Sequence, residues 1–242
     1  MTPESHRASL RNAFTLMELL VVVGIIVVLA ALIFPAVGKI KQASGTAKCV
    51  SNLRQIGQGF RGYINENNGY APPHWGVSFL DPSSGTSSLL WTGHLAPYMG
   101  REGDPLKDKL PRVYDCPEDP DAKKRSPDRG FVSTAENWGL SYGYNYAYLT
   151  SQNNWWRHPV DGYPNLRVVS NMTTLILAAD SMAASKGGEY MALIDATSLA
   201  QNPKRGVDFR HQKMFNAVFL DGHVQGMDGT ILEEQKYWRP QH

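Results

Sequence analysis

This 242-residue chain has almost no excess of positive or negative charge, and it has few cysteines. The chain has 24 lysines and arginines against 22 aspartates and glutamates, which gives a formal net charge of +2. A balance this close to zero gives no electrostatic reason to expect nucleic acid as the main partner. Cys49 and Cys116 are the two cysteines, and two distant thiols provide too few ligands for a zinc site.

Recognisable catalytic motifs are also missing. The sequence contains no nucleophile elbow, no phosphate-binding loop and no metalloprotease helix. It has no internal repeat at the periods typical of solenoids. Serines and histidines are present without a recognisable arrangement. We therefore expect a protein that is not an enzyme and that needs no cofactor.

Charge is almost absent from one long stretch near the amino terminus. Residues 14–34 form a run of 21 residues in which Glu18 is the only charged side chain. A helix of that length spans the hydrocarbon core of a bilayer. An ionisable group costs roughly 2–3 kcal/mol near the centre of such a segment and less near its end. The sequence therefore predicts a functional role for Glu18.

Three plainer explanations compete for this apolar run. A secretory signal peptide has a shorter apolar core, whereas Leu19–Phe34 alone has 16 residues and residues 35–37 are not a convincing cleavage site. A signal anchor, with Arg7 and Arg11 in the cytoplasm, explains everything except Glu18. The buried core helix of a soluble protein is disfavoured by the length of the run.

The sequence Phe14-Thr15-Leu16-Met17-Glu18, after a short basic leader, resembles the amino terminus of type IV prepilins and type II secretion pseudopilins. The resemblance implies cleavage between Ala13 and Phe14, N-methylation of Phe14, and pairing of Glu18 with the amino terminus of a neighbouring subunit. Pro35 matches the helix-bending proline of many family members. The residue before the cut is usually Gly in the family. Ala13 is the smallest substitute, so we expect slower processing rather than none.

A second motif lies near the carboxyl end, where His211 is followed after nine residues by Asp221-Gly222. This spacing resembles that of a large subfamily of prepilin-like proteins in which the role of the motif is undefined. Other stretches match the same subfamily: residues 48–49, 52–55, 116–117, 141–145 and 177–181. The resemblance thus extends over nearly the whole chain.

Geometry argues against a metal or catalytic site built from His211, Asp221 and His223. If Phe215–Leu220 is an extended strand, its six residues span about 20 Å and separate His211 from Asp221. We expect Asp221 to begin a tight Asp-Gly turn with positive φ, and His211 to bond to backbone near the start of the strand.

The resemblance makes Ca²⁺ the metal to consider, because major pseudopilins bind Ca²⁺ through carboxyl-terminal loops. Asp180, Asp221 and Asp228 offer the hard oxygen ligands that Ca²⁺ prefers. No compact acidic loop of matching pattern is visible, so Ca²⁺ stays an alternative to the expectation of no cofactor.

The remaining pattern predicts an α+β fold, with a long amino-terminal helix packed on an antiparallel sheet. Apolar residues and Gly57 recur at helical spacing on one face: Val50, Leu53, Gly57, Phe60 and Ile64. The sequence 65–69 is a helix stop signal. Strands are predicted at 173–179, 215–220 and 223–227, the last two as a hairpin, and short helices at 89–99 and 230–238. The implied organisation is a leader at 1–13, a transmembrane helix at 14–35, its distal half at 36–65, and a pilin-like head domain at 66–242.

Residues 141–148 form a predicted strand with tyrosines at alternate positions: Tyr142, Tyr144, Tyr146 and Tyr148. We expect these rings to pack over the long helix with their hydroxyls at the rim. The alternative is a stacking platform for sugar or peptide that includes the nearby tryptophans: Trp138, Trp155 and Trp156.

Cys49 and Cys116 are permitted to form a disulfide if the domain lies outside the cytoplasm. Closing a loop of about 67 residues contributes roughly 4 kcal/mol in the chain-entropy model. Two unpaired thiols are the alternative.

The function that we expect is that of a filament subunit in a type IV pilus-like or type II secretion system. Its partners would be copies of itself, related subunits, a prepilin peptidase, and an assembly ATPase with its inner-membrane platform. It would cross the inner membrane once, with a cytoplasmic amino terminus. The alternative is a membrane-anchored protein that binds a polysaccharide or surface partner. A minor DNA-binding pilin, using residues 123–125, is a weaker third option.

Overall fold

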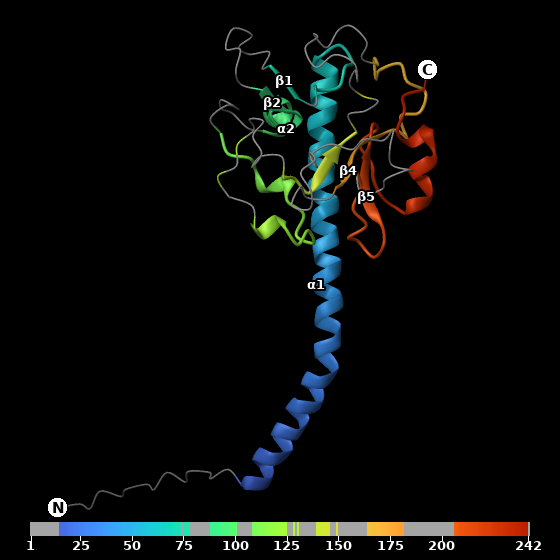
Figure 1. Ribbon diagram of the computed structural model, residues 1–242. Coiled ribbons are helices and arrows are strands. Elements are labelled where there is room, and N and C mark those ends of the chain that lie inside the picture. The colour runs from blue at the N-terminus through green and yellow to red at the C-terminus, as the bar shows by residue number, and fades with distance from the viewer. Residues whose placement is uncertain are drawn as a thin grey trace, which may run out of the picture. The chain divides into compact units, whose positions relative to one another are not determined.

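The computed structural model describes the larger part of the chain (Figure 1). Its described residues are 15–73, 75–77, 88–100, 108–124, 128, 130, 139–145, 149, 164–181 and 206–241. The predicted leader, residues 1–13, lies outside them. The chain divides into two compact units, residues 1–44 and residues 45–242. The second unit therefore begins within the range 36–65 that was predicted as the distal half of the long helix.

One long helix, α1, begins at Leu16 and ends at Glu66. Its opening segment, Leu16–Phe34, is long and apolar enough to cross a membrane, and a signal sequence would have the same character. The helix continues through Pro35. The bend expected at this proline stays a prediction.

The carboxyl end of α1 is closed by a left-handed turn. Asn68 has φ 55° and Gly69 has φ 88°. The Gly69 amide donates to the Ile64 carbonyl at 2.9 Å, which is the six-to-one hydrogen bond of a Schellman motif. Because asparagine and glycine tolerate positive φ, the stop signal predicted at 65–69 is confirmed at this point.

A four-stranded antiparallel sheet forms the second layer of the larger unit. Its strands, in spatial order, are β3 (Tyr142–Tyr144), β4 (Ile176–Asp180), β5 (Phe215–Phe219) and β6 (Val224–Met227). The expected α+β class, with an amino-terminal apolar helix and an antiparallel sheet, is confirmed.

The sheet is covered on both faces (Figure 1). On one face Val218 of β5 lies against α1, where a Cβ added to Gly57 would meet its Cγ2 at 2.5 Å. On the other face Phe215 and Phe219 pack with Trp238. Two 3-10 helices cover that face of the sheet: η6 (Gly229–Glu233) and η7 (Gln235–Tyr237). All five residues of β5 are buried, because each of its two faces has a cover.

Several short elements complete the described fold. A two-stranded sheet pairs β1 (Trp75–Val77) with β2 (Ser88–Leu90). The others are α2 (Trp91–Leu95), η1 (Ala96–Met99), η2 (Arg112–Tyr114) and η3 (Ala122–Lys124). The short helices predicted at 89–99 and 230–238 are confirmed within a few residues. The first is found as α2 followed by η1, after a strand end, and the second as the two 3-10 helices η6 and η7.

The hairpin of β5 and β6 confirms the predicted pairing, with Phe215 opposite Met227 and Val218 opposite Val224. Its turn differs from the expected one. The Gly222 amide donates to the Phe219 carbonyl at 2.9 Å, and positive φ falls on Gly222 (92°) rather than on the preceding aspartate. The prediction of positive φ at Asp221 is therefore wrong, because glycine takes the left-handed position at lower cost.

Candidate functional site

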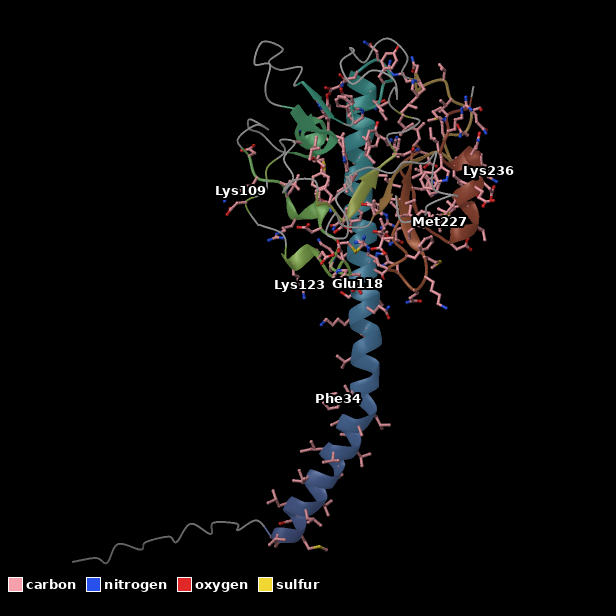
Figure 2. The ribbon with its side chains drawn as sticks, in the orientation of Figure 1. Phe34, Lys109, Glu118, Lys123, Met227 and Lys236 are labelled. Atoms are coloured by element: carbon pink, nitrogen blue, oxygen red, sulfur yellow. A yellow bond between two sulfur atoms is a disulfide. The ribbon has the colours of Figure 1, made fainter. Side chains whose placement is uncertain are left out.

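The opening segment of α1 exposes its apolar side chains on all sides. Figure 2 shows them projecting outward around the helix as far as Phe34, which is 78% exposed. Leu16 and Leu32 are 82% and 69% exposed. Apolar surface of this extent is stable in water only when lipid or another protein covers it. The segment is thus a candidate for insertion into a membrane or for packing against further helices.

Glu18 takes part in a capping box at the start of this helix. Its Oε2 accepts from the Thr15 amide and from the Thr15 Oγ1, both at 2.9 Å. In return the Glu18 amide donates to Thr15 Oγ1 at 3.2 Å. Threonine followed three residues later by glutamate is the sequence signature of this motif, and it identifies a local role for Glu18 that our sequence reasoning missed.

The residues predicted to be processed, Ala13 and Phe14, lie outside the described residues. Their cleavage and methylation stay predictions. The basic stretch 123–125 is described in part, and Lys123 is exposed. Trp138, Trp155, Trp156, Tyr146 and Tyr148 also lie outside the described residues, so the stacking platform stays untested there.

The two described tyrosines of the predicted aromatic strand are fully buried. The ring of Tyr144 lies 5.1 Å from that of Phe60 on α1, centroid to centroid. Its hydroxyl donates to the Pro72 carbonyl at 3.0 Å. The Tyr142 hydroxyl accepts from Asn52 at 3.2 Å, and burial raises the pKa of this phenol. For Tyr142 and Tyr144 the predicted packing over the helix is confirmed. The predicted position of their hydroxyls at the rim is wrong, because each hydroxyl has a buried partner.

Cys49 and Cys116 are joined in a disulfide, drawn as the yellow bond beside α1 in Figure 2. Both cysteines are completely buried. The bond ties α1 to the segment that follows η2, across 67 residues of chain. It therefore fixes a contact between two core segments of the larger unit that are far apart in sequence.

His211 lies directly beside this disulfide. Its Nε2 is 3.5 Å from Cys116 Sγ and 3.3 Å from Asp180 Oδ2. Its Nδ1 is 3.2 Å from Thr46 Oγ1. The side chains of His211 and Asp180 are 3% and 0% exposed. The expectation that His211 bonds mainly to backbone is incomplete: its amide and carbonyl do pair with Met214, but its ring bonds to side chains.

A second ion-pair group lies among the same segments, centred on Arg210. The guanidinium is 3.3 Å from Asp119 Oδ2 and 2.9 Å from Asp208 Oδ2, and its Nη2 also donates to the Ser181 carbonyl. Asp119 accepts from Ser141 Oγ at 2.6 Å. Burial raises the pKa of Asp208, and Arg210 opposes that shift. A buried guanidinium of this kind is tolerated because carboxylates surround it.

Asp221, the other half of the carboxyl-terminal motif, lies at the opposite end of β5 from His211. Its Oδ1 accepts from the His223 amide at 3.0 Å and is 2.6 Å from His223 Nδ1. Its carbonyl accepts from Arg61 Nη1 of α1 at 3.0 Å. The nine residues between His211 and Asp221 include all of β5, so the structure does not bring the motif residues into one site.

The three carboxylates considered for calcium have separate partners. Asp180 Oδ2 accepts from the Asn216 amide at 2.6 Å, Asp221 pairs with His223, and Asp228 accepts from Thr230 at a 3-10 helix start. Among the described residues, the one group of three or more His, Cys, Asp or Glu side chains with ligand atoms close together is Cys49, Cys116 and His211. Calcium at the aspartates gains no support from this arrangement.

Comparison with known proteins gives no relative: no family model, no curated protein and no solved structure matches the chain. The candidate sites therefore rest on the geometry and chemistry of the chain itself.

Proposed function

We propose that this chain is a structural subunit of a type IV pilus-like or type II secretion pseudopilus filament. One observation carries the proposal. A segment of α1 that is apolar on every side contains a single charged residue, Glu18, placed at the third position of the helix. An anchor for a soluble domain needs no such residue, whereas a helix that must dock on its neighbours at one depth does.

Pairing of the Glu18 carboxylate with an amine would offset the cost of placing each charge in hydrocarbon. A carboxylate or an amine alone in hydrocarbon is costly, and each relieves the other's unpaired charge when they meet. The capping bonds from Thr15 both end on Glu18 Oε2. The carboxylate has a second oxygen, and a carboxylate accepts up to four hydrogen bonds. A neighbour's amino terminus at Phe14 would bond to it, so that subunits docked at the wrong depth leave charges stranded.

Removal of residues 1–13 by a prepilin peptidase would create that amino terminus. Arg7 and Arg11 would hold the leader in the cytoplasm before cleavage, and the larger unit would lie outside it. The Cys49–Cys116 disulfide supports this orientation, because disulfides persist in oxidising compartments. An assembly ATPase and a membrane platform would supply the work of extraction.

The alternative, a membrane-anchored ligand-binding protein, gains nothing from the described aromatic residues. Tyr142 and Tyr144 are enclosed in the core and present no ring face to a ligand. Its other candidate rings lie outside the described residues, and no observation favours it over a filament subunit.

Two substitutions separate assembly from helix capping. Glu18→Ala removes the carboxylate, whereas Thr15→Ala removes the Thr15 hydroxyl from the capping box and leaves the carboxylate and the backbone amide that donates to it in place. We expect Glu18→Ala to abolish recovery of the protein in sheared filaments and Thr15→Ala to retain it. Membrane insertion and the fold of the larger unit should be unchanged in both. Equal loss in the two variants would assign Glu18 to capping alone, and wild-type assembly of Glu18→Ala would overturn the proposal.

A further inference from the structure

We propose that the motif of His211 and Asp221-Gly222 is a clasp that fastens both ends of β5 to α1, so that a pull on α1 is passed to the sheet. The two ends of the motif do not meet each other, but each contacts the long helix. His211 Nδ1 lies 3.2 Å from Thr46 Oγ1, and the Asp221 carbonyl accepts from Arg61 Nη1 at 3.0 Å. Because β5 lies between the two motif residues, the spacing of the motif places one attachment at each end of this strand.

The strand β5 lies along α1 and runs in the same chain direction (Figure 1). Three contacts follow the same order in both segments: Thr46 with His211, Gly57 with Val218, and Arg61 with Asp221. The first and the last are about 22 Å apart along the helix, at about 1.5 Å per residue. A slide of β5 along α1 therefore stretches both end bonds at the same time, and each bond adds to the resistance.

The His211 end of the clasp is held inside the core. The His211 side chain is 3% exposed, so its bond to Thr46 is largely shielded from water. Its Nε2 also lies 3.5 Å from Cys116 Sγ, and Cys116 is joined to Cys49 of α1 by the disulfide. Its backbone pairs with Met214, the residue directly before β5. The imidazole thus links the start of the strand both to α1 and to a segment that is covalently bound to α1.

The Asp221-Gly222 end is shaped so that a guanidinium reaches the backbone. Asp221 Oδ1 accepts from the His223 amide at 3.0 Å, which holds the turn after β5. Gly222 has φ 92°, and a Cβ there would lie 3.1 Å from Arg61 Nη1, closer than an ordinary contact. Glycine therefore leaves room for Arg61 to donate to the Asp221 carbonyl, a bond strengthened by the charge of the guanidinium. Each residue of the motif thus has a part in one of the two attachments.

A pull on α1 reaches both attachments because the helix is continuous. It extends from Leu16 to Glu66, and Thr46 and Arg61 both lie on it. The strand β5 passes the load on, since it pairs with β4 on one side and with β6 on the other. Extraction from a bilayer would supply such a pull, so the origin of the load rests on the function proposed above. The clasp itself is a property of the folded larger unit and can be tested without a filament.

Unfolding of the full chain at constant force tests the clasp directly. The protein, in detergent micelles, would be held by ligation tags at its two termini, which leaves Cys49 and Cys116 paired. This geometry pulls α1 from its amino end against the sheet, which is loaded from the carboxyl end through β6. Thr46→Val and Arg61→Met each remove one end bond, and each should raise the unfolding rate at a fixed force by about 5–10-fold. The double variant should unfold about 25–100-fold faster than the wild type, because both bonds break in the same step.

Matched variants separate the clasp from a general loosening of the fold. Arg167→Met also removes a guanidinium that donates to a carbonyl of α1, at Asn65, but Arg167 lies before β4 rather than next to β5 in the chain. Thr174→Val removes a hydroxyl outside the contact of β5 with α1. We expect both to change the rate by less than about twofold. Gly222→Ala should act like Arg61→Met, since the added methyl group would displace the guanidinium.

Two results would overturn the proposal. One is an unfolding rate that rises no more in either Thr46→Val or Arg61→Met than in the matched variants. The other is a double variant that unfolds no faster than the faster of the two single variants. Neither result depends on processing or assembly. A chain that forms no filament but shows these rate increases would refute the function proposed above and leave the clasp in place.

Discussion

At the scale of single residues, Glu18 has a local role in the capping box, in addition to the intermolecular role that we propose for it. Its bonds to Thr15 stabilise the first turn of α1, because they satisfy backbone and side-chain donors at the helix start. Any of several residues could cap this helix from outside the apolar run. A carboxylate inside the run, by contrast, fits the assembly role that we propose.

Gly57 gives a residue-scale prediction about the contact between α1 and the sheet. A Cβ at this position would meet Val218 Cγ2 at 2.5 Å, closer than side chains approach. Gly57→Ala gains about 1 kcal/mol of helix propensity, but overpacking costs typically about 1–3 kcal/mol. We expect a lower free energy of unfolding in denaturant titration, and partial recovery in the double variant with Val218→Ala. Gln58→Ala, at an exposed neighbouring position, should change it by less than about 0.5 kcal/mol.

His94 gives a prediction about pH. Burial lowers the pKa of this imidazole to about 4 in the folded protein, against an ordinary value of 6.5. Between these values the unfolded chain binds the extra proton, so stability is complete above pH 6.5 and falls as the pH falls toward 4. We expect a loss of about 2 kcal/mol from this group between pH 7 and pH 5. Unfolding of His94→Phe should show a correspondingly smaller loss, whereas an unchanged pH dependence would contradict the assignment.

At the scale of elements, the carboxyl-terminal segment is held to the sheet layer by asparagines. Asn171 Nδ2 donates to the Lys236 and Arg239 carbonyls, and its Oδ1 accepts from the Gln241 amide at 2.9 Å. Asn145 Nδ2 donates to the Ile176 and Trp238 carbonyls, both at 2.8 Å. These bonds satisfy backbone groups of the carboxyl-terminal segment and hold it against the sheet layer, where Trp238 packs with Phe215 of β5.

Asn171→Ala therefore tests the attachment of this segment. The change leaves two carbonyls and one amide without their partner, at a cost of about 1–3 kcal/mol where they are buried. We expect faster amide hydrogen exchange over residues 235–241, with β4 and β5 protected as before. Thr173→Ala, at an exposed position nearby, is the control. Unchanged exchange in Asn171→Ala would show that the bonds of Asn171 are not needed to hold this segment.

The elements that could be predicted from sequence are those with local signals. The end of α1 at Asn68-Gly69 and the β5–β6 hairpin follow from turn residues next to periodic patterns. The segment of η6 and η7 was predicted as one short helix at 230–238. Its division into two 3-10 helices had no local signal, because tertiary contacts set it, such as the bond from Trp238 Nε1 to the Ile231 carbonyl. Gly57 was predicted on the apolar face of the helix, but its contact with Val218 was not, because Val218 lies 161 positions away in sequence.

At the scale of the whole molecule, the polar groups beside the disulfide come from segments far apart in the chain. Thr46 lies on α1, Cys116 follows η2, Asp180 ends β4, and His211 precedes β5. His211, Asp180 and the cysteines were each noted in the sequence, but no local spacing shows that they meet. Arg210 and Asp119 gave no signal at all, because an ion pair between distant segments leaves no pattern in either one.

Assembly as a filament subunit would begin with prepilin processing, which the mature amino terminus of the chain would show. The full chain would be co-expressed with a prepilin peptidase and its amino terminus determined by mass spectrometry, with expression lacking the peptidase as control. We expect a product that begins at Phe14 and carries one N-methyl group, and Ala13→Gly should be processed at least as fast. A terminus left intact, or a cut near Pro35, would rule out prepilin processing and leave a signal anchor or a secreted domain.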